Sequence, residues 1–212
     1  AFPSGDDETV LRAVQAICDE GIAKPVLLGN EEVIQKKIES LGLELSDIEI
    51  ISPRHSERSE EYVEKLVELR GRKGVTYEEA RRRIESRLDY SLMALKLGHV
   101  DGVVCGMSRH YNDALRPTLQ IIGLREGFSR AASMHMVIHR RRAVFFADTT
   151  VNLEQDSETL AEVAIECANK VRALGIEPRV AMLSFSNFGS SSHRLSKKVS
   201  KASRPSWSLS VS

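Results

Sequence analysis

The sequence has few of the features that mark a secreted, membrane-spanning or nucleic-acid-binding protein. Only 5% of its 212 residues are aromatic, one is tryptophan, and its 30 basic and 30 acidic residues cancel to zero net charge. A dedicated nucleic-acid binder would carry a basic excess. No apolar run reaches the length of about 18 residues that suggests a transmembrane helix, and the first residues do not resemble a signal peptide. We therefore expect no nucleic-acid partner and no membrane contact.

Cysteine is also scarce, and its placement argues against a disulfide framework. Cys18, Cys105 and Cys167 are odd in number, far apart and in apolar surroundings. They are predicted to be reduced core residues of a cytoplasmic protein. His135 and His139 form an HxxxH pair, but the residues between them resemble a strand and include no glutamate. We expect no metal site there or elsewhere in the chain.

The usual nucleotide fingerprints are missing too, since the chain contains neither a GxGxxG nor a Walker motif. The 42% of hydrophobic residues is nevertheless enough for a packed core, and the length allows one large domain or two small ones. Helical patterns alternate with short apolar runs at 24–29, 48–51 and 100–106, which are predicted strands. This alternation predicts an α/β protein with a mostly parallel sheet.

The rhythm of the sequence changes near Gly127. Two strand-like runs at 133–139 and 143–149 flank the basic turn at 140–142, which predicts an antiparallel hairpin. A long helix follows over 157–174 with Asp156 as its N-cap, and then a strand over 179–185. We expect a first α/β domain over 1–126, part of a second over 127–202, and a disordered serine-rich tail over 203–212.

Three polar segments next to these predicted elements are candidates for binding an anion. They are LRGRKG (69–74), GMSRHYNDALRP (106–117) and LSFSNFGSSS (183–192). Ligands of open α/β sheets bind beyond the carboxyl ends of the strands, where the second and third segments are expected. Guanidinium groups suit phosphate and carboxylate, and small residues let backbone N–H groups approach an anion. Each segment alone also fits a surface loop, but together they predict a phosphate or a phosphorylated cofactor as ligand.

Several of these segments resemble the phosphotransacetylase (phosphate acetyl/butyryl transferase) family. The resemblance runs from about residue 2 to residue 201. In chain order, it rests on FPSGDDETVLRA, RGRKGVTYEEA, VDGVVCG, DALRPTLQIIG, VFFADTTVN, LAEVAIECA and PRVAMLSFSNFGS. Within the family, SFSNFGS is most like the C-terminal domain of hybrid NADP-dependent malic enzymes, because active phosphotransacetylases resemble SFSTKGS there. Asp113 and Arg116 match the DTxRP motif of the active enzymes, but Ala114 replaces its threonine.

The resemblance implies a three-layer α/β/α architecture of two domains like that of isopropylmalate dehydrogenase, here incomplete because a closing segment is expected to be missing. It implies acetyl-CoA as ligand or substrate, phosphate as the second small molecule, a homo-oligomer and no covalently bound cofactor. Arg70 and Arg116 match the arginines that bind the anion in the family. The residues expected to bind acetyl-CoA or phosphate are Arg70, Ser108, Asp113, Arg116, Ser186, Asn187, Gly189 and Ser190.

Two functions follow from the resemblance, and a plain α/β domain with structural anion loops is the third alternative. The first is a regulatory and oligomerisation domain that senses acetyl-CoA for a malic enzyme, in which a separate N-terminal part decarboxylates malate oxidatively to pyruvate. The second is an active phosphate acetyltransferase, which converts acetyl-CoA and phosphate into acetyl phosphate and CoA. We prefer the first, expect this piece to be inactive by itself, and assign no residue a catalytic role.

Overall fold

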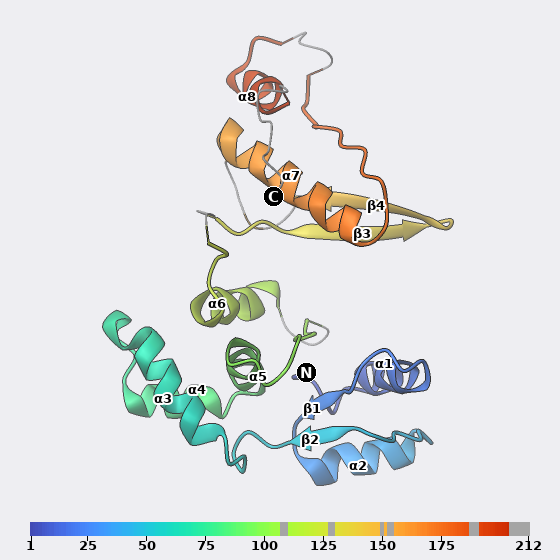
Figure 1. Cartoon of the computed structure of the whole chain (residues 1–212), viewed down its shortest axis with the longest axis vertical. Coiled ribbons are helices and arrows are strands. Elements are labelled where there is room, and N and C mark those ends of the chain that lie inside the picture. Colours follow the sequence, from blue (N-terminus) through green and yellow to red (C-terminus); the bar gives the residue numbers. More distant parts are fainter. Residues whose placement is uncertain (107–109, 127–129, 149–150, 152–154, 187–190, 204–212) are drawn as a thin grey trace. The chain divides into compact units, whose positions relative to one another are not determined.

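The computed structural model describes residues 1–106, 110–126, 130–148, 151, 155–186 and 191–203 (Figure 1). The chain divides into two compact units, Ala1–Gly123 and Leu124–Ser212. Helices and small sheets make up both units, so the expected α/β class is confirmed. The domain limits expected from the sequence remain a prediction. No helix among the described residues is long and apolar enough to cross a membrane.

The first unit contains one parallel pair of strands and a series of helices. In chain order its elements are α1 (Glu8–Asp19), β1 (Val26–Leu28), α2 (Glu31–Ser40), β2 (Glu49–Ile51), α3 (Ser59–Arg70), the 3-10 turn η1 (Gly71–Lys73), α4 (Tyr77–Ile84), α5 (Arg87–Lys96) and α6 (Tyr111–Ile121). Figure 1 shows α1 and α2 on one side of the β1–β2 pair and α3, α4 and α5 on the other.

Each of the two strands packs side chains on both faces of the pair, because successive side chains of a strand point in opposite directions. Leu27 of β1 packs with α1 and α2, and Ile50 of β2 lies against the same cluster. Leu28 belongs instead to the cluster formed by α3, α4, α5 and α6, against which Ile51 packs. The two strands pair in register, Leu27 with Ile50 and Leu28 with Ile51. Both faces of this pair are therefore covered by helices, as expected for a parallel sheet.

Polar side chains cap the starts of helices α2 and α4. The Asn30 side chain accepts a hydrogen bond from the Val33 amide at the start of α2, and Thr76 accepts one from the Glu79 amide at the start of α4. Each bond satisfies an amide that has no partner within its own helix.

Helix α5 is buried on nearly all sides, from Leu88 to Ala94. Three of its buried residues are polar, and each has a partner. Asp89 accepts a hydrogen bond from Arg83 Nε at 2.7 Å, the Tyr90 hydroxyl lies 2.5 Å from Ser56 Oγ, and Ser91 donates to the Arg87 carbonyl. The Arg83–Asp89 pair is well shielded, with side chains 18% and 9% exposed. Helix α5 can therefore lie in the core without an unpaired polar side chain.

The loop before α1 is tied to the start of α5 by an ion pair. Arg87 donates from Nη1 to the Asp6 carboxylate at 2.6 Å. The hydrogen bond from Arg87 is the main reason that the pKa of Asp6 is lowered, and burial acts in the opposite direction. Lys37 of α2 donates to the Asp6 carbonyl at 2.5 Å. The segment that leaves Phe2 is thus held between α2 and α5.

The expectation of a buried strand over 100–106 is wrong. This segment forms no strand, and Val104 is 64% exposed. It pairs briefly with the N-terminus, where the Val104 amide donates to the Ala1 carbonyl and Ala1 donates to Gly102. Phe2 in turn bridges to Leu27 of β1. The apolar run is therefore extended next to the sheet but lacks the cover that would bury it.

The second unit contains the predicted hairpin and the predicted long helix. Its elements are β3 (Met134–His139), β4 (Arg142–Ala147), α7 (Ser157–Ala173) and α8 (Arg194–Ala202). Strands β3 and β4 are antiparallel, and the turn places Arg140 and Arg141 at φ of 47° and 63°. Both residues adopt the left-handed conformation that a two-residue hairpin turn requires. Figure 1 shows α7 running along the hairpin, and Asp156 caps its first turn as predicted.

Two further expectations for this half of the chain are not met. Residues 179–185 form no strand, and Leu183 and Phe185 are 79% and 68% exposed. A strand needs a neighbour for its backbone groups, and no described segment pairs with this one. Residues 204–212 of the expected disordered tail lie outside the described residues, and Ser203 caps α8.

The cysteines also differ from the prediction in one respect. No disulfide joins them, and Cys18 and Cys167 are partly buried, but Cys105 is exposed rather than a core residue. The reason is that Cys105 belongs to the segment that does not become a buried strand.

We predict that removing the Asp89 carboxylate strongly destabilises the first unit. Asp89→Ala leaves the Arg83 guanidinium without its partner in a shielded place, and this is expected to lower the free energy of unfolding by about 3 kcal/mol. Urea unfolding followed by circular dichroism measures the change. Glu8→Ala, which breaks the exposed Glu8–Arg12 pair on α1, is the control and should change it by less than about 0.5 kcal/mol. A similar effect of both variants would contradict the prediction.

The lowered pKa of Asp6 predicts a pH-dependent contribution to stability. A carboxyl with a lowered pKa in the folded state stabilises the fold above its unfolded pKa and loses that contribution as the pH falls through the folded pKa. Asp6→Asn should therefore lower the free energy of unfolding by about 1 kcal/mol at neutral pH, with a difference that vanishes in acid below the folded pKa. Urea titrations across this range test it, with the exposed Asp19→Asn as control. A difference that stays constant with pH would refute the prediction.

Candidate functional site

Arg70 is the last residue of α3 and lies at the start of the cationic segment 69–74. It is partly buried, and its Nε atom is buried without a hydrogen-bond partner among the described residues. The chain then turns through η1, and the Val75 amide bonds back to the Arg70 carbonyl. A buried guanidinium nitrogen without a partner is uncommon and loses free energy relative to a paired one. An anion held by this side chain would remove that deficit.

Asp113 and Arg116 lie in α6, and here the structure corrects the sequence analysis. Segment 106–117 is not a loop throughout, because α6 begins at Tyr111. Both residues are exposed. Pro117 is inside the helix, where a proline removes one backbone hydrogen bond. Arg116 lies on the exposed surface of α6 and forms no ion pair with another described residue.

Packing in the first unit brings the helices of Arg70 and Arg116 into contact. Helices α3 and α6 touch each other, and both pack on α5. Ala114 of α6 lies against the cluster that contains Tyr62, Val63 and Leu66 of α3. The two candidate arginines therefore come from neighbouring helices of one unit, although 46 residues separate them in the sequence.

The remaining candidate residues belong elsewhere or cannot be placed. Ser186 lies in the second unit, where its amide donates to Ser184 Oγ and its own Oγ accepts from the Ser191 amide. The other candidates lie outside the described residues: Ser108, Asn187, Gly189 and Ser190.

The sequence analysis missed a polar cavity at the carboxyl end of β1. This cavity of about 620 Å³ is lined by the loop after Phe2 and by Lys37, Glu85 and Arg87. Gly5 is required here, since a Cβ atom on it would lie 2.8 Å from the Leu28 carbonyl. The signal for this cavity in the sequence was the FPSGDD segment, which begins at Phe2, the residue that bridges to Leu27 of β1. Arg87 pairs with the Asp6 carboxylate, and Lys37 donates to the Asp6 backbone carbonyl. Asp7, Glu8 and Glu85 also line the cavity, so acidic side chains outnumber the two cations and the cavity does not favour an anion.

Comparison with known proteins identifies two groups of relatives. The chain is 38% identical over 201 residues to the phosphate acetyltransferase of Bacillus subtilis, covering 95% of this chain and 62% of that protein. It is 37% identical over 205 residues to the NADP-dependent malic enzyme of Escherichia coli, covering 95% of this chain but 27% of that protein. The chain thus spans less than two thirds of either relative.

The fold has a counterpart among solved structures. The EutD phosphotransacetylase from Staphylococcus aureus matches with a TM-score of 0.83 and 36% identity, over 95% of this chain and 61% of that chain. The family described as Phosphate acetyl/butaryl transferase matches residues 1–207. These agreements confirm the resemblance inferred from the motifs, and the chain belongs to the phosphate acetyl/butyryl transferase family.

Proposed function

We propose that the chain is a phosphotransacetylase-type domain that binds acetyl-CoA and phosphate, and that it senses acetyl-CoA as the regulatory domain of an NADP-dependent malic enzyme. The observation that carries the binding role is the unpaired, buried Nε of Arg70, on a helix packed against the helix of Arg116. Two guanidinium groups on adjoining helices offer planar, bidentate donors to the phosphate groups of a coenzyme or to free phosphate.

The chemistry of the family reaction requires separate groups for proton transfer and for charge stabilisation. A base must remove the thiol proton of CoA, and cations must hold the phosphate while charge develops. Arg70 and Arg116 suit the second task, and we propose the anion-binding role for them alone. The small residues of segment 183–192 suit the phosphate groups of the coenzyme, because backbone N–H groups approach an anion closely there.

Two residue differences favour regulation over catalysis. Ala114 lies where active relatives resemble a threonine, so one hydroxyl donor next to Arg116 is lost. Asn187 and Phe188 replace a small or cationic pair in the glycine-containing segment. Both differences remove polar groups from the expected anion site, and neither removes an arginine. Binding without turnover is the consequence that we expect.

The finer architecture belongs to the same proposal. We propose three layers, a mostly parallel sheet and a division into two domains like that of isopropylmalate dehydrogenase, with homo-oligomers formed by the domain. The parallel pairing of β1 with β2 and the helices on both of its faces support the layered arrangement. The cytoplasmic location remains a prediction from the sequence.

An active phosphate acetyltransferase is the second candidate. It is favoured by the larger share of those relatives that the chain covers, 62% against 27% for the malic enzyme. The two candidates share the binding site and differ in the fate of acetyl-CoA. Turnover of acetyl-CoA that depends on phosphate therefore separates them.

We predict that Arg116→Ala weakens acetyl-CoA binding by about 1.5–3 kcal/mol, the usual contribution of a hydrogen bond to a charged group. Isothermal titration calorimetry on the full chain measures the affinity. Arg12→Ala, which removes an exposed arginine of α1, is the matched control and should leave the affinity unchanged. Arg70→Lys, which keeps the charge but loses the planar fork, should also weaken binding. An unchanged affinity in both site variants would remove these arginines from the site.

We also predict that the chain binds acetyl-CoA without forming acetyl phosphate. The reason is that alanine at position 114 and phenylalanine at position 188 lack the polar groups that active relatives resemble at these positions. A colorimetric thiol assay with and without phosphate measures release of CoA. Phosphate-dependent release that persists after repurification would support the acetyltransferase instead. Absence of both binding and release would overturn the proposed function altogether.

A further inference from the structure

A second cavity of the first unit lies away from the candidate arginines. It has a volume of about 620 Å³ and follows the face of the β1–β2 pair, with walls from α3 and α5. Val26, Leu28 and Ile51 form an apolar floor, while Tyr62 and Tyr90 stand in the wall. Neither Arg70, Asp113 nor Arg116 lines this cavity. Its size is within the range of sites that hold small organic molecules.

One end of the cavity carries hydrogen-bond donors. The Tyr62 hydroxyl lies 2.7 Å from His99 Nδ1, and the two rings stack at 5.6 Å. Burial raises the pKa of Tyr62 to about 12, with Tyr90 acting in the same direction, while the hydrogen bond and charge of Arg58 act in the opposite one. The hydroxyl therefore keeps its proton at neutral pH. When the Tyr62 hydroxyl donates to Nδ1, His99 retains a proton on Nε2. This end of the cavity therefore offers the Arg58 guanidinium and the His99 Nε2–H to a carboxylate.

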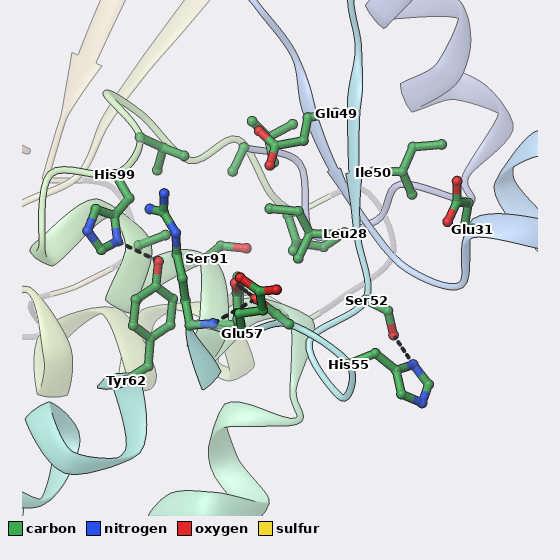
Figure 2. Close-up of a pocket in the computed structure, with 18 of the residues that line it drawn as sticks. Leu28, Glu31, Glu49, Ile50, Ser52, His55, Glu57, Tyr62, Ser91 and His99 are labelled. Atoms are coloured by element: carbon green, nitrogen blue, oxygen red, sulfur yellow. Dashed lines mark hydrogen bonds between the residues drawn. The ribbon is translucent and has the colours of Figure 1, made fainter. Parts of the chain in front are cut away.

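Four glutamates also line the cavity, together with Asn30, Ser52, His55 and the N-terminal Ala1. Figure 2 shows the Tyr62–His99 pair at one end and Glu31, Ser52 and His55 at the other, with Leu28 and Glu49 between them. None of the four glutamates that line the cavity has an ion pair with another described residue: Glu31, Glu32, Glu49 and Glu57. Glu31 and Glu32 lie in the first turn of α2, where they also stabilise the helix dipole. Glu49 has no such role, and its side chain lies on the cavity face of β2.

The walls that separate these charges are already ordered. Tyr62 and Tyr90 are each 1% exposed, and their ring centroids are 4.8 Å apart. The Tyr90 hydroxyl is fixed by Ser56 Oγ, and Ser91 is fully buried behind it. A ligand would therefore meet a preformed apolar floor between the Tyr62–His99 end and Glu49, with little ordering of side chains on binding.

We propose that this cavity binds a small zwitterion, with its carboxylate at the Arg58–Tyr62–His99 end, its ammonium at Glu49 and an aliphatic stem on the floor of Val26, Leu28 and Ile51. Arg58 and Glu49 form no ion pair with each other inside the cavity. A ligand that carries both charges would pair with both side chains at the same time. The proposal is independent of acetyl-CoA binding, because it uses none of the residues assigned to that site.

Three probes of nearly equal length test the proposal on the full chain. They are 6-aminohexanoate, which carries both charges, hexanoate, which carries only the carboxylate, and hexylamine, which carries only the ammonium. Chemical-shift titration of the amide resonances measures their affinities and locates the binding. We expect 6-aminohexanoate to bind saturably and at least about tenfold more tightly than either single-charge probe, since each end adds a charge-assisted bond. The shifted amides should belong to β2, the start of α3 and residues near His99.

Two variants assign the ends of the ligand. Arg58→Gln should weaken 6-aminohexanoate about tenfold and leave hexylamine unchanged, whereas Glu49→Gln should weaken it similarly and leave hexanoate unchanged. Arg54→Gln and Glu39→Gln, exposed residues that do not line the cavity, are the matched controls. All variants change exposed residues, so the fold should persist, and the amide spectrum verifies this. Failure of 6-aminohexanoate to saturate, equal binding of hexylamine, or insensitivity to Arg58→Gln would each overturn the proposal.

Discussion

Burial of α5 is the constraint on which the first unit depends. This helix lies among α3, α4 and α6, and seven successive residues of it are buried. A buried helix must find partners for every polar side chain it carries, because an unpaired one costs about 1–3 kcal/mol. Asp89 is matched by Arg83, Tyr90 by Ser56, and the exposed start of the helix by the Arg87–Asp6 pair. These contacts fix α4, the loop before α3 and the N-terminal loop relative to one core.

The same packing brings together the two helices of the candidate anion site, although its two arginines lie far apart in the sequence. Arg70 ends α3 and Arg116 lies in α6, and the two helices meet because both pack on α5. The two kinds of cation in this unit differ clearly. Arg83 and Arg87 are neutralised by aspartates and stabilise the fold, whereas Arg70 retains an unpaired buried nitrogen. That difference, rather than the number of arginines, sets the proposed binding side chain apart from the structural ones.

Helix α3 connects the proposed anion site with the proposed zwitterion site. Tyr62 lines the cavity near the start of the helix, and Arg70 ends it eight residues later, which corresponds to about 12 Å along a helix axis. Tyr62 is held by Tyr90 and His99, so its position is set by the core as well as by the cavity. The two sites thus share a rigid element while using different side chains and recognising different charges.

Local signals in the sequence determined which segments become helices and where they begin. Asp156 caps α7 as predicted, Asn30 and Thr76 are residue types that favour the same role, and the hairpin around Arg140 follows from two strand-like runs and a short turn. The family could also be recognised from its motifs. Strands at 100–106 and 179–185 were predicted wrongly, because an apolar run becomes a buried strand only when another segment pairs with it and covers it. The cavity at Tyr62, His99 and Glu49 could not be predicted either, since its lining comes from distant segments that only tertiary packing brings together.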